Sequence, residues 1–140
     1  MEFIQVGDVE EQIVTLKKLV RISDPGANPL LTANSIRAVD FDISKDFEWV
    51  NPNPTVGLSF ATSMKQFKKL VKSKGRFFSE IDVYAIDDNE FFEEGLRFIR
   101  DSPGHASLTV TRKMKVGELI SKLEKLSKMM ESIGKIKVNP

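Results

Sequence analysis

Short segments in which apolar and polar residues alternate follow one another along the second half of this chain. Ile81 to Ile86 alternates in this way, Leu96 to Ile99 is a second such segment, and Ala106 to Thr111 is a third. Alternation predicts half-buried strands. Because the strands come in runs and do not alternate strictly with helices, we expect an α+β fold with mostly antiparallel, twisted sheets flanked by helices.

Two amphipathic helices are expected beside these strands. The first follows Thr62 or Ser63, either of which can cap a helix, and it ends near Gly75. The second is the longest helical pattern in the chain. It runs from about Lys115 to Ser132, with Gly134 as its expected C-terminal stop.

The first half of the chain has less regular patterns. Residues 1–12 are expected to form a flexible or helical lead-in. Asp8 to Leu19 fits a helix that passes into a short strand around Val20 to Ser23, and a strand that begins near Ile13 is the alternative.

Three further segments precede the first amphipathic helix. Ser35 to Ile43 alternates as an irregular strand would, and Gly57 to Phe60 fits a short strand. Between them, two prolines within residues 51–54 break regular structure. We therefore expect an exposed loop at Phe47 to Thr55, which carries the only tryptophan, Trp49.

The overall composition narrows the classes of function. The chain has 140 residues, the size of one domain, which we place at 1–140. Its 21 basic and 20 acidic residues give a net charge of +1, which disfavours nucleic acid as a partner. The absence of cysteine and the single histidine argue against thiolate chemistry and a metal site.

The sequence also bears on location. No apolar run reaches the ~20 residues that span a bilayer, so no membrane span is expected. The N-terminus lacks the pattern of a secretory signal. The expected location is the cytoplasm, or the cytoplasm of a target cell that is reached by a signal-less secretion route.

Two charged clusters have simple interpretations. A basic face on the first amphipathic helix is typical of a solvated surface, and phosphate binding is the alternative. It comprises Lys65, Lys68, Lys69, Lys72, Lys74 and Arg76. The acidic run from Asp87 to Glu94 lacks the ligand spacing and the glycine of a calcium loop, so we expect a turn that leads into a short helical segment.

Three segments, taken in order, resemble a known family. They are Leu19-Val20-Arg21-Ile22, Gly57-Leu58-Ser59-Phe60-Ala61-Thr62-Ser63 and Gly104-His105-Ala106-Ser107-Leu108-Thr109-Val110-Thr111-Arg112-Lys113-Met114. The chain resembles the ADP-ribosyltransferase-like toxin family of bacterial secretion systems over about Leu19 to Met130. There an early strand carries an arginine, a strand with Gly-x-Ser leads into a helix, and a histidine-containing strand ends in methionine before the last helix.

The resemblance implies an ADP-ribosyltransferase-like toxin domain that uses NAD, or a related nucleotide, against an intracellular target, with an immunity or antitoxin protein as partner. It assigns NAD binding to Arg21, Ser59, Ser63 and His105, and catalysis to His105 and Ser59. An arginine can hold phosphate oxygens through two parallel hydrogen bonds. A serine at a strand-to-helix junction can fix the ribose or the nicotinamide beside the helix N-terminus.

The chain departs from this broad enzyme class in one respect. Such transferases orient the ribose with a glutamate, and the strand Ala106 to Thr111 contains none. Glu80 and Glu118 are candidates by position only. The chain therefore fits either NAD-dependent ADP-ribosyl transfer or NAD binding without turnover.

Two other classes of function stay open. A ribonuclease-type toxin would use His105 as general acid or base, with Arg21, Arg112 and Lys113 stabilising the phosphorane. A non-catalytic interaction module would use the Trp49 loop and the last helix as its contact surface.

Overall fold

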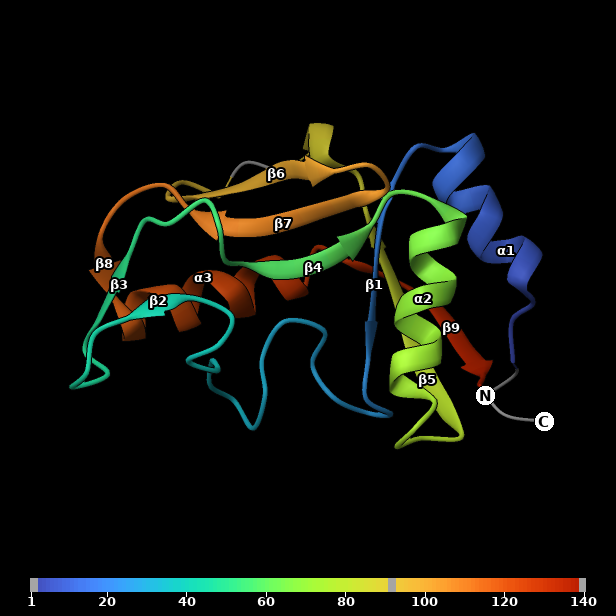
Figure 1. Cartoon of the computed structure of the whole chain (residues 1–140), viewed down its shortest axis with the longest axis horizontal. Coiled ribbons are helices and arrows are strands. Elements are labelled where there is room, and N and C mark those ends of the chain that lie inside the picture. Colours follow the sequence, from blue (N-terminus) through green and yellow to red (C-terminus); the bar gives the residue numbers. More distant parts are fainter. Residues whose placement is uncertain (1–2, 91–92, 139–140) are drawn as a thin grey trace.

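The computed structural model describes residues 3–90 and 93–138 and has an α+β architecture (Figure 1). Its main sheet has six strands in the order β6-β7-β4-β1-β5-β9, and each neighbouring pair is antiparallel. The α+β class and the mostly antiparallel sheets predicted from the sequence are thereby confirmed.

The main sheet consists of two halves that cross. Its strands are β1 (Leu19–Ser23), β4 (Leu58–Ala61), β5 (Glu80–Ile86), β6 (Leu96–Ser102), β7 (His105–Val110) and β9 (Glu131–Lys137). In Figure 1, β4, β6 and β7 run across the view while β1 and β5 run down it. One register pair, Val20 with Ala61, joins β1 to β4 where the halves meet.

Helices cover both faces of this sheet. They are α1 (Val6–Glu10), which continues as a π-helical turn (Glu11–Thr15), α2 (Met64–Lys74) and α3 (Val116–Ser127), with a short 3-10 turn at Asp88–Glu90. The core under α3 contains Leu19 and Phe60, whereas the core under α1 and α2 contains Val20 and Val83. No helix of the described residues is long and apolar enough to cross a membrane.

Several predicted elements are confirmed. The strand expected around Val20 to Ser23 forms as β1, although the helix expected over Asp8 to Leu19 ends at Thr15. The segments expected around Gly57 to Phe60, Ile81 to Ile86 and Ala106 to Thr111 contain strands. Ser63 caps α2, because its side chain accepts a hydrogen bond from the backbone N–H of Gln66. These elements have local signals, namely periodicity and a capping hydroxyl.

The loop predicted at Phe47 to Thr55 is interrupted by a strand, and the predicted exposure of Trp49 is wrong. Trp49 lies in β3 (Trp49–Asn51), which pairs with β2 (Asp42–Ile43) and β8 (Met114–Lys115) in a second, three-stranded sheet. The side-chain nitrogens of Lys113 and Lys115 lie 4.9 and 5.4 Å from the centre of its ring. Trp49 is therefore half-buried under two cations and is not displayed on an exposed loop.

The predicted strand from Ser35 to Ile43 is also largely wrong. Only β2 forms at its end, and the rest belongs to a long loop in which Ala33 and Asn34 have positive φ angles of 49° and 62°. Ile36 and Phe41 are buried in the core under α3. Their spacing thus reflects a loop that packs on the core, not a strand that pairs with a neighbour.

The last helix is shorter than predicted. It ends at Ser127, and the chain continues into β9, which pairs with β5 along the edge of the main sheet. Gly134 is not a helix stop, because it lies within β9 at a φ of 135°, where the register with β5 shifts. The backbone pairing of β5 overrides the helical spacing of the apolar residues in this segment.

Candidate functional site

Arg21 holds the two halves of the main sheet together from β1. Its Nε donates a hydrogen bond of 2.6 Å to the carbonyl of Pro29, and its Nη1 donates one of 2.8 Å to the carbonyl of Ser59 on β4. The guanidinium carbon lies 5.8 Å from the centre of the Phe60 ring. Two carbonyls and an aromatic face therefore fix its orientation.

The charge of Arg21 has no carboxylate partner among the described residues. Its Nη2 likewise makes no hydrogen bond to them, and the side chain is partly buried. Burial lowers the pKa of Arg21 to about 10, so the guanidinium stays protonated at neutral pH. This arginine is a fixed cation with free N–H donors.

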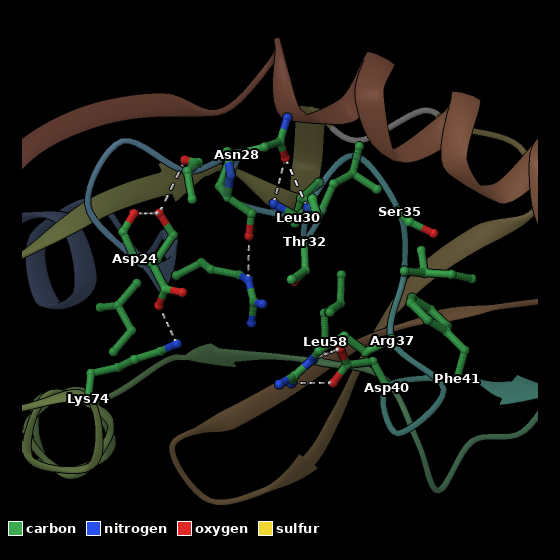
Figure 2. Close-up of a pocket in the computed structure, with 18 residues that line it drawn as sticks. Asp24, Asn28, Leu30, Thr32, Ser35, Arg37, Asp40, Phe41, Leu58 and Lys74 are labelled. Atoms are coloured by element: carbon green, nitrogen blue, oxygen red, sulfur yellow. Dashed lines mark hydrogen bonds and ion pairs between the residues drawn. The ribbon is translucent and has the colours of Figure 1, made fainter. Parts of the chain in front are cut away.

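A cavity of about 220 Å³ lies between Arg21 and residues 24–41 (Figure 2). In Figure 2, Asp24 and Lys74 lie on one side of the cavity and Arg37 and Asp40 on another. Lys74 Nζ donates to Asp24 at 2.6 Å. Arg37 donates two hydrogen bonds to Asp40, at 2.9 and 3.0 Å. Three cations therefore face two carboxylates, and the positive charge in excess favours an anionic ligand.

The loop that encloses this cavity is held by Asn28. The side-chain oxygen of Asn28 accepts hydrogen bonds from the backbone N–H groups of Leu30 and Leu31, at 2.8 and 3.0 Å. Its side-chain nitrogen donates to Ser127 at the end of α3. Leu30 and Leu31 are buried, so the loop is anchored both by hydrogen bonds and by apolar packing.

Ser59 shares a second cavity with Arg21. This cavity has a volume of about 180 Å³ and is also lined by Arg37, Lys74 and, from α2, Leu70. The hydroxyl of Ser59 makes no hydrogen bond to the described residues. The structure therefore brings together two of the predicted site residues, Arg21 and Ser59.

His105 begins β7 and is oriented by a carboxylate that the sequence analysis missed. Its Nδ1 lies 2.6 Å from Asp101, and the hydroxyl of Ser107 donates to the other oxygen of Asp101 at 2.6 Å. Desolvation acts to raise the pKa of Asp101, but the hydrogen bonds from Ser107 and His105 together lower it. A carboxylate on Nδ1 fixes the imidazole and leaves Nε2 for proton transfer.

The position of Asp101 depends on a hairpin that local patterns do not reveal. The register of β6 with β7 shifts between Ile99 and Ser102, and this irregularity brings Asp101 next to His105 and Ser107. The available signal was the spacing of four residues from Asp101 to His105 around the Pro-Gly turn.

His105 and Ser59 lie on the same face of the sheet. Ser59 is directly opposite Ser107, and Ala61 is directly opposite His105 in the β4–β7 register. Opposed residues of an antiparallel pair point to one face. Val20 of β1 pairs with Ala61 and shares this face, whereas Arg21, the next residue, leaves the strand towards Phe60 on the opposite face. Neither cavity beside Arg21 includes His105.

Ser63 has a structural partner in addition to its predicted binding role. It caps α2 and lies against Gly104, where an added Cβ would collide with its hydroxyl. Gly104 has a φ of 80°, and its carbonyl accepts a hydrogen bond from Thr62 at 2.8 Å. The turn that precedes His105 is thus packed against the start of α2.

The remaining candidates lie elsewhere. Arg112 donates to Glu94 and Glu118, and Lys135 lies 3.6 Å from Glu80. None of these residues lines either cavity beside Arg21. Glu80 and Glu118 are thus engaged in other ion pairs and do not supply a carboxylate to these cavities.

A scan against protein-family models, a search of curated proteins and a search of solved structures each found no match to this chain.

Proposed function

We propose that this chain binds NAD beside Arg21 and Ser59 and acts as a toxin-like ADP-ribosyltransferase, or as an NAD-binding domain, on an intracellular target. The observation that carries the proposal is the guanidinium of Arg21, a fixed cation without a carboxylate partner among the described residues and with free donors beside two cavities. A pyrophosphate is the part of NAD that such a group recognises, since a guanidinium binds phosphate oxygens through parallel hydrogen bonds.

The two cavities suit part of a dinucleotide. Their volumes are about 220 and 180 Å³. Ligand pockets commonly measure about 300–1,000 Å³. We therefore infer that the pyrophosphate and the adjoining ribose enter, with Ser59 donating to the sugar or the nicotinamide, while the adenosine lies outside.

The arrangement of strands supports the ADP-ribosyltransferase-like interpretation. The arginine-bearing strand β1, the Gly-x-Ser strand β4 and the histidine strand β7 are neighbours in the sheet, in the order β7-β4-β1. β4 leads into α2, and β7 leads by way of Met114 towards α3. The three segments that carry the family resemblance are thus adjacent, as a shared nucleotide site requires.

His105 is the proposed general base of the reaction. When nicotinamide leaves C1′ of the ribose, it takes the electron pair of the glycosidic bond. Water or a hydroxyl of the target then attacks C1′ and gives its proton to Nε2 of His105. Asp101 holds the opposite nitrogen at 2.6 Å and stabilises the imidazolium that results.

Calorimetric titration with NAD, together with an assay of NAD loss, tests the proposal. Arg21→Lys keeps the charge but loses the planar fork, so we expect NAD binding to weaken roughly tenfold or more. Arg112→Lys is the matched control and should bind as the unaltered chain does. Because neither cavity beside Arg21 includes His105, His105→Ala should keep NAD binding and lose turnover, in contrast to the binding role that the family resemblance assigns to it.

Failure to bind NAD would contradict the proposal, and so would equal loss in the two arginine variants. Binding without NAD loss would leave the non-catalytic form of the proposal.

The hydrogen bond between Asp101 and His105 also favours a second candidate function, a ribonuclease-type toxin. In that case RNA fragments would accumulate, His105→Ala would abolish them, and NAD would be neither bound nor consumed. Arg112 is less able to stabilise a phosphorane than the sequence predicts, because Glu94 and Glu118 already neutralise the charge of Arg112.

A further inference from the structure

A groove of about 410 Å³ lies between α2 and β9, on a part of the surface that shares no residue with the cavities beside Arg21. Its apolar lining comes from Phe67 and Val71 of α2, from Ile136 of β9, and from Val138 and Val6. The side chain of Val6 is exposed at 45%. The groove therefore offers apolar surface to a partner.

The rim of this groove is basic throughout. Lys68 and Lys72 of α2, Arg76 after it, and Lys137 of β9 are its charged lining residues, and no acidic side chain of residues 3–90 or 93–138 lines it. None of these four cations forms an ion pair with the described residues, and the sequence of α2 contains no acidic residue. By contrast, Lys74 at the end of the same helix is paired with Asp24.

We propose that this groove binds an acidic amphipathic helix of a partner protein. The apolar side chains of such a helix would lie on Val71 and Ile136, and its carboxylates would reach the cations of the rim. Lys68 and Lys72 are one helical turn apart, a spacing that matches carboxylates placed four residues apart on a facing helix.

Other ligand classes satisfy only part of these features. A single fatty acid carries one carboxylate and would leave most of the four cations without a counter-charge. A nucleic acid would neutralise the cations but leave the apolar lining exposed to water, because its backbone offers phosphate and sugar. A membrane surface would meet the cations, but it is broad and flat, whereas the apolar residues here lie within a groove.

The test uses a fluorescently labelled synthetic helix of about four turns, with leucines on one face and glutamates beside them. Anisotropy titration should give saturable binding in the micromolar range. Lys68→Glu together with Lys72→Glu should weaken it roughly tenfold or more. The matched control is Lys65→Glu together with Lys69→Glu, which makes the same charge change on the same helix outside the groove and should leave affinity within about twofold.

Two further probes decide between partner classes. The same peptide with serine in place of leucine should bind weakly, because the apolar contact is lost. Phosphatidylserine vesicles and single-stranded RNA should bind less tightly than the leucine peptide. Absence of saturable peptide binding, equal loss in both double variants, or tighter binding of vesicles or RNA would each overturn the proposal.

Discussion

Arg21 and Arg112 are the same residue type in opposite electrostatic surroundings. Arg112 donates to both oxygens of Glu94, at 2.7 and 2.9 Å, and also to Glu118. These hydrogen bonds raise its pKa, whereas burial lowers the pKa of Arg21 to about 10. Among the residues that the structure describes, Arg21 donates only to carbonyls. Carbonyls satisfy N–H groups without cancelling the charge, so Arg21 keeps its attraction for an anion and Arg112 does not.

The largest expected difference between the two arginines concerns stability. Arg21→Ala leaves the carbonyls of Pro29 and Ser59 without their donor, and it should lower the free energy of unfolding by about 2 kcal/mol or more. Arg112→Ala removes exposed ion pairs and should cost less. Urea denaturation of both variants measures the difference. If Arg112→Ala proved the more destabilising, the comparison would fail.

A smaller effect is expected from the carboxylates beside Arg21. Asp40→Asn removes a negative charge from the cavity and frees Arg37, so inorganic pyrophosphate should bind roughly threefold to tenfold more tightly. Calorimetry measures this change. Asp46→Asn, an exposed aspartate outside the cavity, is the control and should have no effect. Weaker binding by Asp40→Asn would show that Asp40 orders the site and does not compete with the ligand.

The smallest effect concerns the stability of the protein at low pH, where Glu94 beside Arg112 becomes protonated. Hydrogen bonds from Arg112, and then from Lys122, lower the pKa of Glu94 from 4.5 to about 2. A lowered pKa gives stability that is complete above pH 4.5 and is lost as the pH falls towards 2. Thermal unfolding across this range should therefore show a shallower decline for Glu94→Gln than for the unaltered chain. Glu124→Gln, on the exposed side of α3, should follow the unaltered chain.

The sequence predicts those parts of the molecule whose cause is local. Ser63 and the apolar face of α2 lie within a few residues of each other, and the alternation in β5 is visible without a partner strand. The sequence does not predict β9, because this strand forms by pairing with β5, about fifty residues earlier in the chain. Gly134 looks like a helix stop in sequence, but in the structure it pairs with Val83 beside the point where the register of β9 with β5 shifts.

The residues of the candidate site likewise fall into two groups: those that sequence motifs predict and those whose position depends on tertiary structure. Arg21 and Ser59 were predicted from motifs, and they share a cavity. Asp101 was missed, because its contact with His105 depends on an irregular register in the β6–β7 hairpin. The loop that encloses the larger cavity is shaped by Asn28 and by buried leucines, which is a matter of tertiary packing that periodicity does not report.

The hydrogen bond from Arg21 to the carbonyl of Ser59 crosses the sheet where a single register pair joins β1 to β4. At this junction the side chain of Arg21 helps to join β1 to β4, whereas backbone hydrogen bonds join the other neighbouring strands. The same guanidinium therefore contributes to ligand binding and holds the two halves of the sheet together. An anion that binds the free nitrogen of Arg21 will therefore also stabilise the junction between the two halves of the sheet. We expect the melting temperature of the protein to rise when such an anion is bound.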